Sequence, residues 1–248
     1  MHMRKKKWAR PELAGCPYYA AFPEDKRGQW RKCFPAQPHL HLELGCGKGV
    51  GTAACALHNP DTGLVAVDIS DDVLGDARRN AELAFGGRPV NNLFLAKLDI
   101  SYIEHFFGPD DQVERIYLPF SNPWPRRRHA KRRLTHPRQL MQYRTFMAPE
   151  GEIYFKTDDL PFFQASLEYF EACGFETVYL THDLHASGFT PNYVTEHEAH
   201  FSALGLPIHF GIFRMLPGTF VPDSMRFGMP GEDEPEEEDS SEAVDGAV

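Results

Sequence analysis

Short apolar segments that each end in a polar side chain recur along the middle of this chain. Residues 39–44 alternate apolar and polar side chains and stop at a glycine turn, and residues 63–68 form a buried run that ends on an acid. Segments 93–98, 113–118 and 152–156 have the same character, with helical patterns between them. Alternating apolar strands and helices build a parallel sheet covered on both faces. The chain is therefore expected to be an α/β protein with a mostly parallel sheet.

The polar residues that follow these strands predict a ligand site. In open α/β sheets the ligand binds outside the carboxyl ends of the strands, near the point where the strand order reverses. The polar residues at the strand ends are Glu43, Asp68, Asp99, Asn122 and Asp158. We expect them to lie along one edge of the sheet.

The turn after the first strand, residues 45–49, reads Gly-Cys-Gly-Lys-Gly. Its spacing differs from the dinucleotide pattern Gly-x-Gly-x-x-Gly, and such a turn can also merely join a strand to a helix. Asp68 follows Gly45 by 23 residues, where an acid can hold both ribose hydroxyls. Glu43 lies against the turn, where its carboxylate would repel a pyrophosphate and attract a cation. This favours S-adenosylmethionine, a sulfonium with an amino group, over NAD.

A proline-rich, basic loop follows the strand that ends at Leu118. Three prolines between residues 119 and 125 fix φ, so Asn122 and Trp124 are expected to be extended in a stiff, exposed loop. Six Lys or Arg and one His lie within residues 126–133. An aromatic face and a polar group beside dense positive charge suit a base next to a phosphate backbone. The alternative is a solvated basic loop with a packed tryptophan.

Composition excludes several classes of protein. A chain of 248 residues can bury one large core in a single domain. No run approaches the roughly 18 apolar residues of a membrane helix, and no apolar segment follows the basic N-terminus, so neither a membrane protein nor a secretory signal is expected. Five cysteines without Cys-x-x-Cys spacing predict neither a disulfide framework nor a zinc site. We expect a cytoplasmic protein with free thiols and no bound metal.

The formal net charge of −9 comes from one end of the chain. Residues 232–248 hold nine acids and no base, and removing these nine from the total of 35 leaves 26 acids against 26 Lys and Arg. An anionic partner is therefore not excluded, because the body is neutral and carries basic clusters at 4–10 and 126–133. We expect a basic and aromatic arm over residues 1–35, one domain over 36–222, and an acidic, disordered tail over 223–248.

Longer motifs resemble a known family. The glycine turn resembles motif I of class I S-adenosylmethionine-dependent methyltransferases. Residues 117–134, with Pro-Trp-Pro and the basic run, are similar to the signature of tRNA (guanine-N7-)-methyltransferases of the bacterial TrmB type. Phe155-Lys156-Thr157-Asp158, Thr195-Glu196-His197-Glu198 and residues 201–208 are also similar, so the resemblance covers roughly residues 39–213.

The resemblance implies a Rossmann-like fold with a mostly parallel, seven-stranded sheet and helices on both faces. It also implies S-adenosyl-L-methionine as cofactor and methylation of N7 of a guanine in the tRNA variable loop, usually position 46. The partner would be tRNA, and the chain would be a monomer or homodimer that binds no membrane.

Residue roles follow from the same resemblance. The expected cofactor-binding residues are Glu43, Gly45, Gly47, Asp68, Asp99 and Asn122. The expected substrate-binding residues are Arg126, Asp158, Thr195, Glu196, His197 and Glu198, and the expected catalytic residues are Asn122 and Asp158. The basic run predicts contacts to the RNA backbone from Arg127, Arg128, Lys131, Arg132 and Arg133. Either Asp158 or Glu198 is expected to hydrogen-bond the N1 and N2 edge of guanine, and Trp124 either stacks on the base or packs against the sheet.

Two positions depart from the family pattern. Asn122 stands where the family has Asp, and His197 stands where it has Tyr. If the family Asp only hydrogen-bonds, Asn122 supports a reduced rate, whereas if it must stabilise a cationic transition state the chain is slow or inactive. An active enzyme and a tRNA- and cofactor-binding paralogue with little turnover are therefore both open. A small-molecule methyltransferase is disfavoured, because a small neutral acceptor has no need of the basic run.

Overall fold

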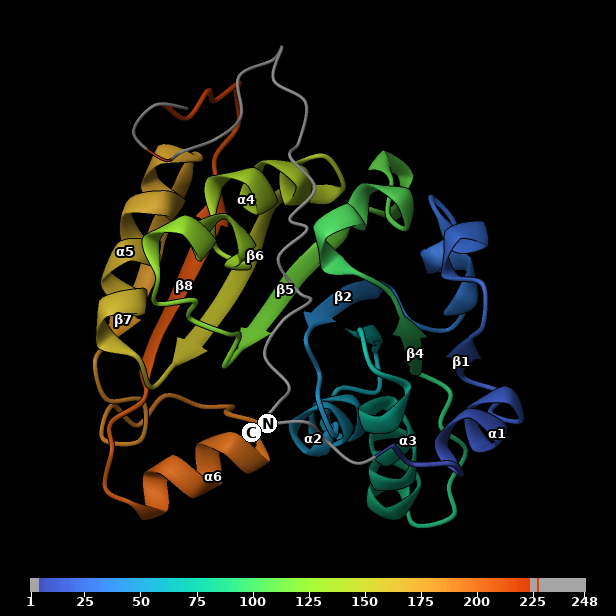
Figure 1. The fold of residues 1–248 in the computed structure, drawn as a ribbon. Coiled ribbons are helices and arrows are strands. Elements are labelled where there is room, and N and C mark those ends of the chain that lie inside the picture. Colours follow the sequence, from blue (N-terminus) through green and yellow to red (C-terminus); the bar gives the residue numbers. More distant parts are fainter. Residues whose placement is uncertain (1–4, 224–226, 228–248) are drawn as a thin grey trace, which may run out of the picture.

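A single eight-stranded sheet runs through the molecule (Figure 1). The computed structural model describes residues 5–223 and residue 227. The strands are β1 (Tyr19–Ala20), β2 (His39–Leu44), β3 (Thr62–Asp68), β4 (Leu93–Lys97), β5 (Val113–Pro119), β6 (Met147–Thr157), β7 (Phe175–Thr181) and β8 (His209–Met215). Their order is β1-β4-β3-β2-β5-β6-β8-β7. Strands β1 to β6 pair in parallel, and β8 is antiparallel to both β6 and β7. The mostly parallel α/β sheet expected from the sequence is confirmed.

The sheet has one strand more than the seven expected. The additional strand is β1, whose two residues pair in parallel with β4, Tyr19 opposite Leu95 and Ala20 opposite Ala96. Two residues are too few to show an apolar period, so the sequence pattern carries no signal for this strand.

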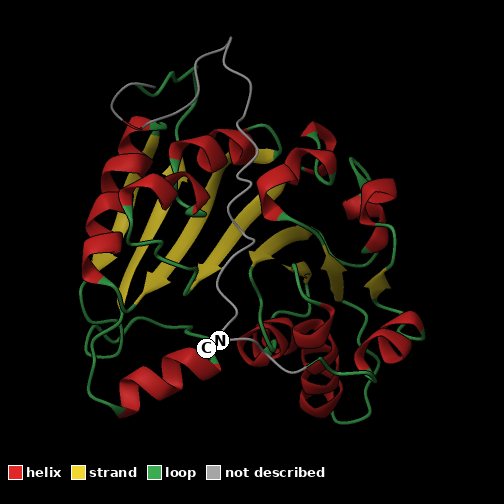
Figure 2. Cartoon of the chain, in the orientation of Figure 1, coloured by secondary structure: helices red, strands yellow, loops and turns green. Residues whose placement is uncertain are grey.

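Helices cover both faces of the sheet (Figures 1 and 2). The α-helices are α1 (Ala9–Ala14), α2 (Val50–His58), α3 (Asp71–Phe85), α4 (Pro137–Arg144), α5 (Leu160–Ala172) and α6 (Glu196–Ala203). The 3₁₀ helices are η1 (Pro23–Lys26), η2 (Trp30–Cys33), η3 (Ile100–His105), η4 (Pro109–Asp111) and η5 (Arg127–Arg132). One apolar cluster joins α2 and α3 to the sheet, and another joins α4 and α5 to it.

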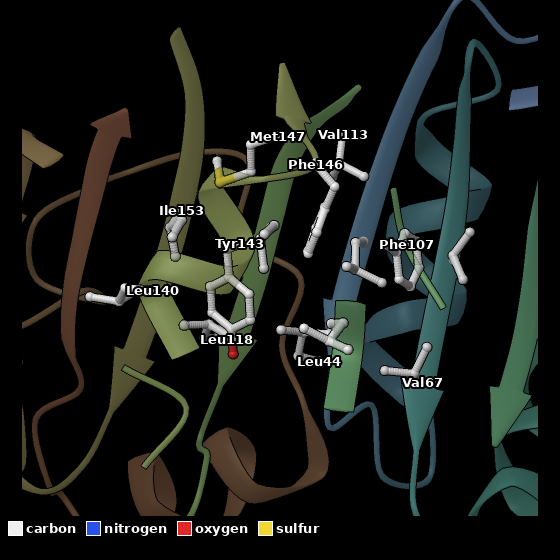
Figure 3. Packing of buried hydrophobic residues seen from close by; sticks show 14 of the residues in the cluster. Leu44, Val67, Phe107, Val113, Leu118, Leu140, Tyr143, Phe146, Met147 and Ile153 are labelled. Carbon is white, nitrogen blue, oxygen red and sulfur yellow. The ribbon is translucent and has the colours of Figure 1, made fainter. Parts of the chain in front are cut away.

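The alternation of side chains along the strands divides the core between these two clusters. Leu118 on β5 and Ile153 on β6 lie with Tyr143 of α4 in the α4 and α5 cluster (Figure 3). Leu64 and Ala66 of β3 belong instead to the α2 and α3 cluster. Strands buried on both faces explain why residues 63–67 contain no polar side chain.

Residues 5–35 contain one short α-helix, one short strand and two 3₁₀ helices. Helix α1 packs on α3, where a Cβ added to Gly75 would lie 2.7 Å from the Cβ of Ala9. Lys6 forms an ion pair with Asp76 of the same helix. Trp30 and Phe34 are buried in the cluster that contains α4 and α5, so part of the segment 5–35 contributes to the core of the domain. The acidic run of the expected tail, residues 232–248, lies outside the described residues.

Candidate active site

The glycine turn between β2 and α2 adopts a left-handed backbone at three positions. The angle φ is +79° at Gly45, +54° at Gly47 and +70° at Gly49, a region that residues with a side chain rarely occupy. A Cβ at Gly49 would lie 2.6 Å from the Cβ of Ala77, so this glycine allows α2 to pack on α3. A Cβ at Gly45 or Gly47 would have no atom within 4 Å, so these two glycines border open space that a ligand can enter.

Asp68 is the last residue of β3 and lies beside this turn, whereas Asp99 follows β4, the next strand in the sheet. The Asp68 carboxylate accepts the Gly47 N–H and the Ser70 N–H, each at 3.1 Å. Burial raises the pKa of Asp68, and these backbone donors oppose the rise. Because a carboxylate has about four acceptor positions, Asp68 retains capacity for ribose hydroxyls. Asp99 is exposed and accepts the Ser101 N–H at 2.9 Å.

Glu43 is a buried acid at the end of β2 and is 5% exposed. Burial raises the pKa of its carboxyl to about 7, although the nearby charge of Lys156 lowers it. An adjacent cation strongly stabilises a desolvated carboxyl group of this kind, because the cation favours the ionised form. The ammonium and sulfonium groups of S-adenosylmethionine therefore fit the chemistry of this position.

Two adjoining cavities lie at the carboxyl ends of the strands. The smaller, of about 190 Å³, is lined by the glycine turn, by Pro119 and Phe120 after β5, and by residues 195–197. The larger, of about 350 Å³, lies over β5 and β6 beside α2. Both are lined by Gly51, Pro119 and Thr195, so they are continuous at this rim.

The loop after β5 differs from its expected conformation at Trp124. The expectation of an extended backbone there is wrong, because φ at Trp124 is +42°. The conformation is held from both sides: Asn122 Oδ1 accepts the Trp124 N–H at 3.0 Å, and Arg133 Nη2 donates to the Trp124 carbonyl at 3.2 Å. The Trp124 ring is half-buried and packs against Arg132, whose guanidinium is 5.2 Å from the ring centroid. Trp124 therefore packs on the basic run, while Asn122 is exposed at the strand end.

The basic residues of this loop divide into two groups. Arg126, Arg128 and Lys131 are exposed. Arg133 turns inward, where its guanidinium donates to the Pro123 carbonyl at 2.8 Å and to the Tyr169 hydroxyl at 3.1 Å. The side chain of Arg127, whose backbone opens η5, lies outside the described residues.

Asp158 follows β6 and faces α6. Its Oδ1 lies 3.1 Å from Nε2 of His197, and both side chains are partly exposed. The His197 ring lies between two aromatic rings, 4.6 Å from Phe120 and 4.4 Å from Phe201, measured between centroids. The imidazole that replaces the family tyrosine thus forms part of the wall of the smaller cavity.

Glu198 lies in the interior and is 0% exposed. Its carboxylate accepts from Lys156 Nζ at 2.5 Å and from Asn192 Nδ2 at 2.6 Å. Lys156 Nζ also donates to the Tyr193 carbonyl at 3.0 Å, so one ammonium group ties β6 to both the loop before α6 and the helix itself. Of the two acids expected to bind guanine, Asp158 is the more accessible, with a side chain 25% exposed against 0% for Glu198. Its partner His197 lines the smaller cavity.

Thr195 and Glu196 fix the start of α6 above the glycine turn. Thr195 Oγ1 accepts the Glu198 N–H at 3.1 Å and caps the helix. Glu196 forms an ion pair with Lys48 of the glycine turn at 2.9 Å, and this hydrogen bond raises the pKa of Lys48. The predicted cofactor and substrate segments are therefore adjacent in space.

Lys156 belongs to this site but is not among the site residues expected from the sequence. A lysine inside an otherwise apolar strand is a signal that could have indicated it, since a buried ammonium needs an acidic partner.

In the described part of the chain, no group of three or more His, Cys, Asp or Glu side chains could hold a metal ion. No helix among residues 5–223 has the length and apolar character required to cross a membrane.

Comparisons with known proteins agree with this geometry. A family model described as "Putative methyltransferase" matches residues 37–210. The tRNA (guanine-N(7)-)-methyltransferase of Clostridium beijerinckii is 50% identical over 212 residues, which cover 85% of this chain and 97% of the relative. The protein of the same name from Clostridium perfringens strain SM101 is 47% identical over 219 residues, covering 87% of this chain and 100% of the relative.

Solved structures support the fold at much lower identity. The 16S rRNA methyltransferase KamB matches with a TM-score of 0.57 and 12% identity, covering 76% of this chain and 93% of that chain. The antibiotic-resistance methyltransferase Kmr matches with a TM-score of 0.52 and 16% identity, covering 76% and 92%. These structures establish the Rossmann-like methyltransferase fold, and the identity to the curated relatives over nearly their whole length establishes more: the chain belongs to the tRNA (guanine-N7)-methyltransferase family.

Proposed function

We propose that this protein transfers a methyl group from S-adenosylmethionine to N7 of a guanine in tRNA. The observation that carries the proposal is the juxtaposition around the smaller cavity. There the open glycine turn meets the segment 195–197, and His197 links this segment to Asp158. A cofactor bound along the turn would present its methyl group next to groups suited to hold a purine.

The cofactor supplies an electrophilic methyl group on sulfur. On the protein side, Glu43 would balance the positive end of the cofactor, Asp68 would accept hydrogen bonds from the ribose, and Asp99 and Asn122 would be the remaining cofactor-binding residues. Gly45 and Gly47 leave its approach to the backbone unhindered.

Guanine N7 is an unprotonated lone pair, so the reaction needs no general base to create the nucleophile. The task of the site is alignment of N7 with the methyl–sulfur bond and exclusion of water, which can lower a barrier by several kcal/mol. We assign the guanine N1 and N2 edge to Asp158, because Glu198 is neutralised by Lys156 in the interior. The product base is cationic, and the Asp158 charge stabilises it as it forms.

The exposed cations of the basic loop are proposed to bind the tRNA backbone. Arg126, Arg128 and Lys131 lie directly after the strand end that bears Asn122. Phosphate contacts of this kind orient an RNA without reading its sequence. From the family resemblance, we propose that the target guanosine is at position 46 in the variable loop of the tRNA.

Methyl transfer to an unmodified tRNA transcript tests the proposal. The expected product is N7-methylguanosine in the variable loop, detected by chemical cleavage at the modified base. A transcript with adenosine in place of that guanosine is the matched control and should accept no methyl group. Cofactor and tRNA binding without transfer would overturn the proposal in favour of the binding paralogue, for which the exposed amide of Asn122 is the supporting feature.

The setting of this activity is proposed to be the cytoplasm. All five cysteines are free thiols, and Cys46, Cys55 and Cys173 are buried among the helices and strands. Free thiols suit a reducing compartment. A monomer or a homodimer is expected, and light scattering of the purified protein distinguishes them.

A further inference from the structure

The larger cavity borders Glu43 at the cofactor edge and extends from there along β5 and β6. Pro119 stands at its rim, and Arg115 lines it four residues earlier on the same strand. At about 3.3 Å per residue, the cavity therefore reaches roughly 13 Å back along the sheet. Its roof is the loop of residues 189–193, which Lys156 fixes through Asn192 and Tyr193.

Aromatic rings form the walls of this cavity. Tyr154 of β6 lies opposite Tyr117 of β5 in the sheet register, with 5.6 Å between ring centroids. Phe210 of β8 and Phe189 of the roof stand 5.8 Å and 6.5 Å from the Tyr154 ring. Rings exposed to a slot of about 350 Å³ offer faces on which a flat heterocycle can stack.

Polar groups are present at the edges of the same slot. The Arg115 guanidinium lies 4.2 Å from the centroid of the Tyr154 ring. Its Nε is buried and has no hydrogen-bond partner among the described residues. Asn59, which directly follows α2, also lines the cavity, and its amide donates to the Tyr193 hydroxyl at 2.7 Å. Guanidinium and amide groups are the groups that recognise the edge of a nucleobase.

The slot is continuous with the candidate active site, since Gly51, Pro119 and Thr195 border both cavities. A nucleotide adjacent to the target guanosine is covalently tied to it, so its base can enter a slot that opens at the same rim. We infer that the larger cavity is a second base-binding site, which takes the unstacked nucleobase of a nucleotide next to the methylated guanosine. This inference rests on the proposed function and extends it to the flanking nucleotide.

The inference predicts an energetic coupling between one protein ring and one RNA base. Unmodified tRNA transcripts carrying a single abasic nucleotide, either directly before or directly after the target guanosine, are compared with the intact transcript. For the wild-type protein, one of the two abasic positions should raise KM about tenfold, the size expected for a lost stacking contact. For Tyr154→Ala, intact tRNA should already show the higher KM, and the abasic change should raise it no further.

Controls separate this result from general damage. Phe22→Ala removes an exposed ring far from the slot and should retain the wild-type dependence on the flanking base. Tyr154→Phe keeps the ring, so it should retain most of the coupling that Tyr154→Ala loses. If Tyr154→Ala does not fold, Phe189→Ala on the roof repeats the test without altering a strand.

Three outcomes overturn the inference. The first is an equal effect of the abasic position in the wild type and in Tyr154→Ala. The second is no effect of either abasic position on the wild-type protein. The third is a parallel loss of S-adenosylmethionine affinity in Tyr154→Ala, which would assign the slot to the cofactor. A wild type that fails to methylate intact tRNA contradicts the proposed function itself, so the two failures are distinguishable.

Discussion

At the residue scale, Asn122 differs from the family aspartate only in having an amide where the aspartate has a carboxylate. Its Oδ1 already accepts the Trp124 N–H at 3.0 Å, and an aspartate oxygen could make the same bond. Asn122→Asp would therefore keep the loop geometry and add only a negative charge beside the proposed site of methyl transfer. This substitution isolates electrostatics from hydrogen bonding.

We expect Asn122→Asp to raise the single-turnover rate of methylation by about tenfold, since each 1.4 kcal/mol of extra stabilisation of the cationic transition state is worth that factor. Rapid-quench measurement at saturating tRNA and cofactor gives the rate. Asn122→Ala removes both the charge and the hydrogen bond, so it should be slower than the wild type. An unchanged rate in Asn122→Asp would show that the family acid acts only as a hydrogen-bond acceptor.

Glu43, also a single residue, is expected to make the affinity for S-adenosylmethionine depend on pH. Burial raises its pKa to about 7, and only the ionised carboxylate attracts the cationic cofactor. Affinity for S-adenosylmethionine should therefore increase with pH, by about tenfold between pH 6 and pH 8, as the ionised fraction rises. Calorimetric titration measures it. In Glu43→Gln the affinity should be weaker at pH 8 and nearly independent of pH, and a pH dependence that survives the substitution would point to another group.

At the scale of elements, Lys156 joins β6 to α6 through Glu198. Lys156→Met would leave the Glu198 carboxylate buried without its cation, which typically costs about 3–5 kcal/mol of unfolding free energy. Urea denaturation should show this loss. Adding Glu198→Gln to Lys156→Met removes the unpaired charge and should restore part of the stability. A double variant no more stable than Lys156→Met would mean that the lysine acts through its other two contacts.

The strands from residue 39 onward could be predicted because each is long enough to show an apolar pattern. The polar ends of β2, β3 and β4, with Glu43, Asp68 and Asp99, fall together for the same reason, since parallel strands share one carboxyl edge. Strand β1 and the conformation of Trp124 could not be predicted. Strand β1 depends on its pairing with β4, and the Trp124 conformation depends on the contact from Arg133. Both partners are distant in the sequence, so the local sequence pattern does not indicate these contacts.

The whole molecule is charged unevenly, and this governs how RNA approaches it. Exposed cations cluster after β5, whereas Lys6 and Arg10 near the N-terminus are already paired with acids of α3. An electrostatic contact to phosphate releases counterions, so tRNA affinity should fall as salt increases. Among the described residues, the cluster of exposed cations that follows β5 is therefore the expected contact for the RNA backbone.

Arg128→Gln and Lys131→Gln should each weaken tRNA binding and lower the slope of log Kd against log salt concentration by about one. Filter binding over a range of salt concentrations measures the slope. Arg88→Gln removes an exposed charge beyond the C-terminal end of α3 and should leave the slope unchanged. Equal slopes for Lys131→Gln and Arg88→Gln would exclude Lys131 from the RNA contact.

The inward-facing Arg133 has a kinetic consequence for the whole encounter with tRNA. Its guanidinium holds the carbonyls of Pro123 and Trp124, so the loop that presents Asn122 is already rigid before RNA arrives. The entropy of ordering this segment is lost during folding and not during association. Binding should therefore proceed in one step, with an observed rate that rises linearly with tRNA concentration and does not saturate at a slow rearrangement of the protein.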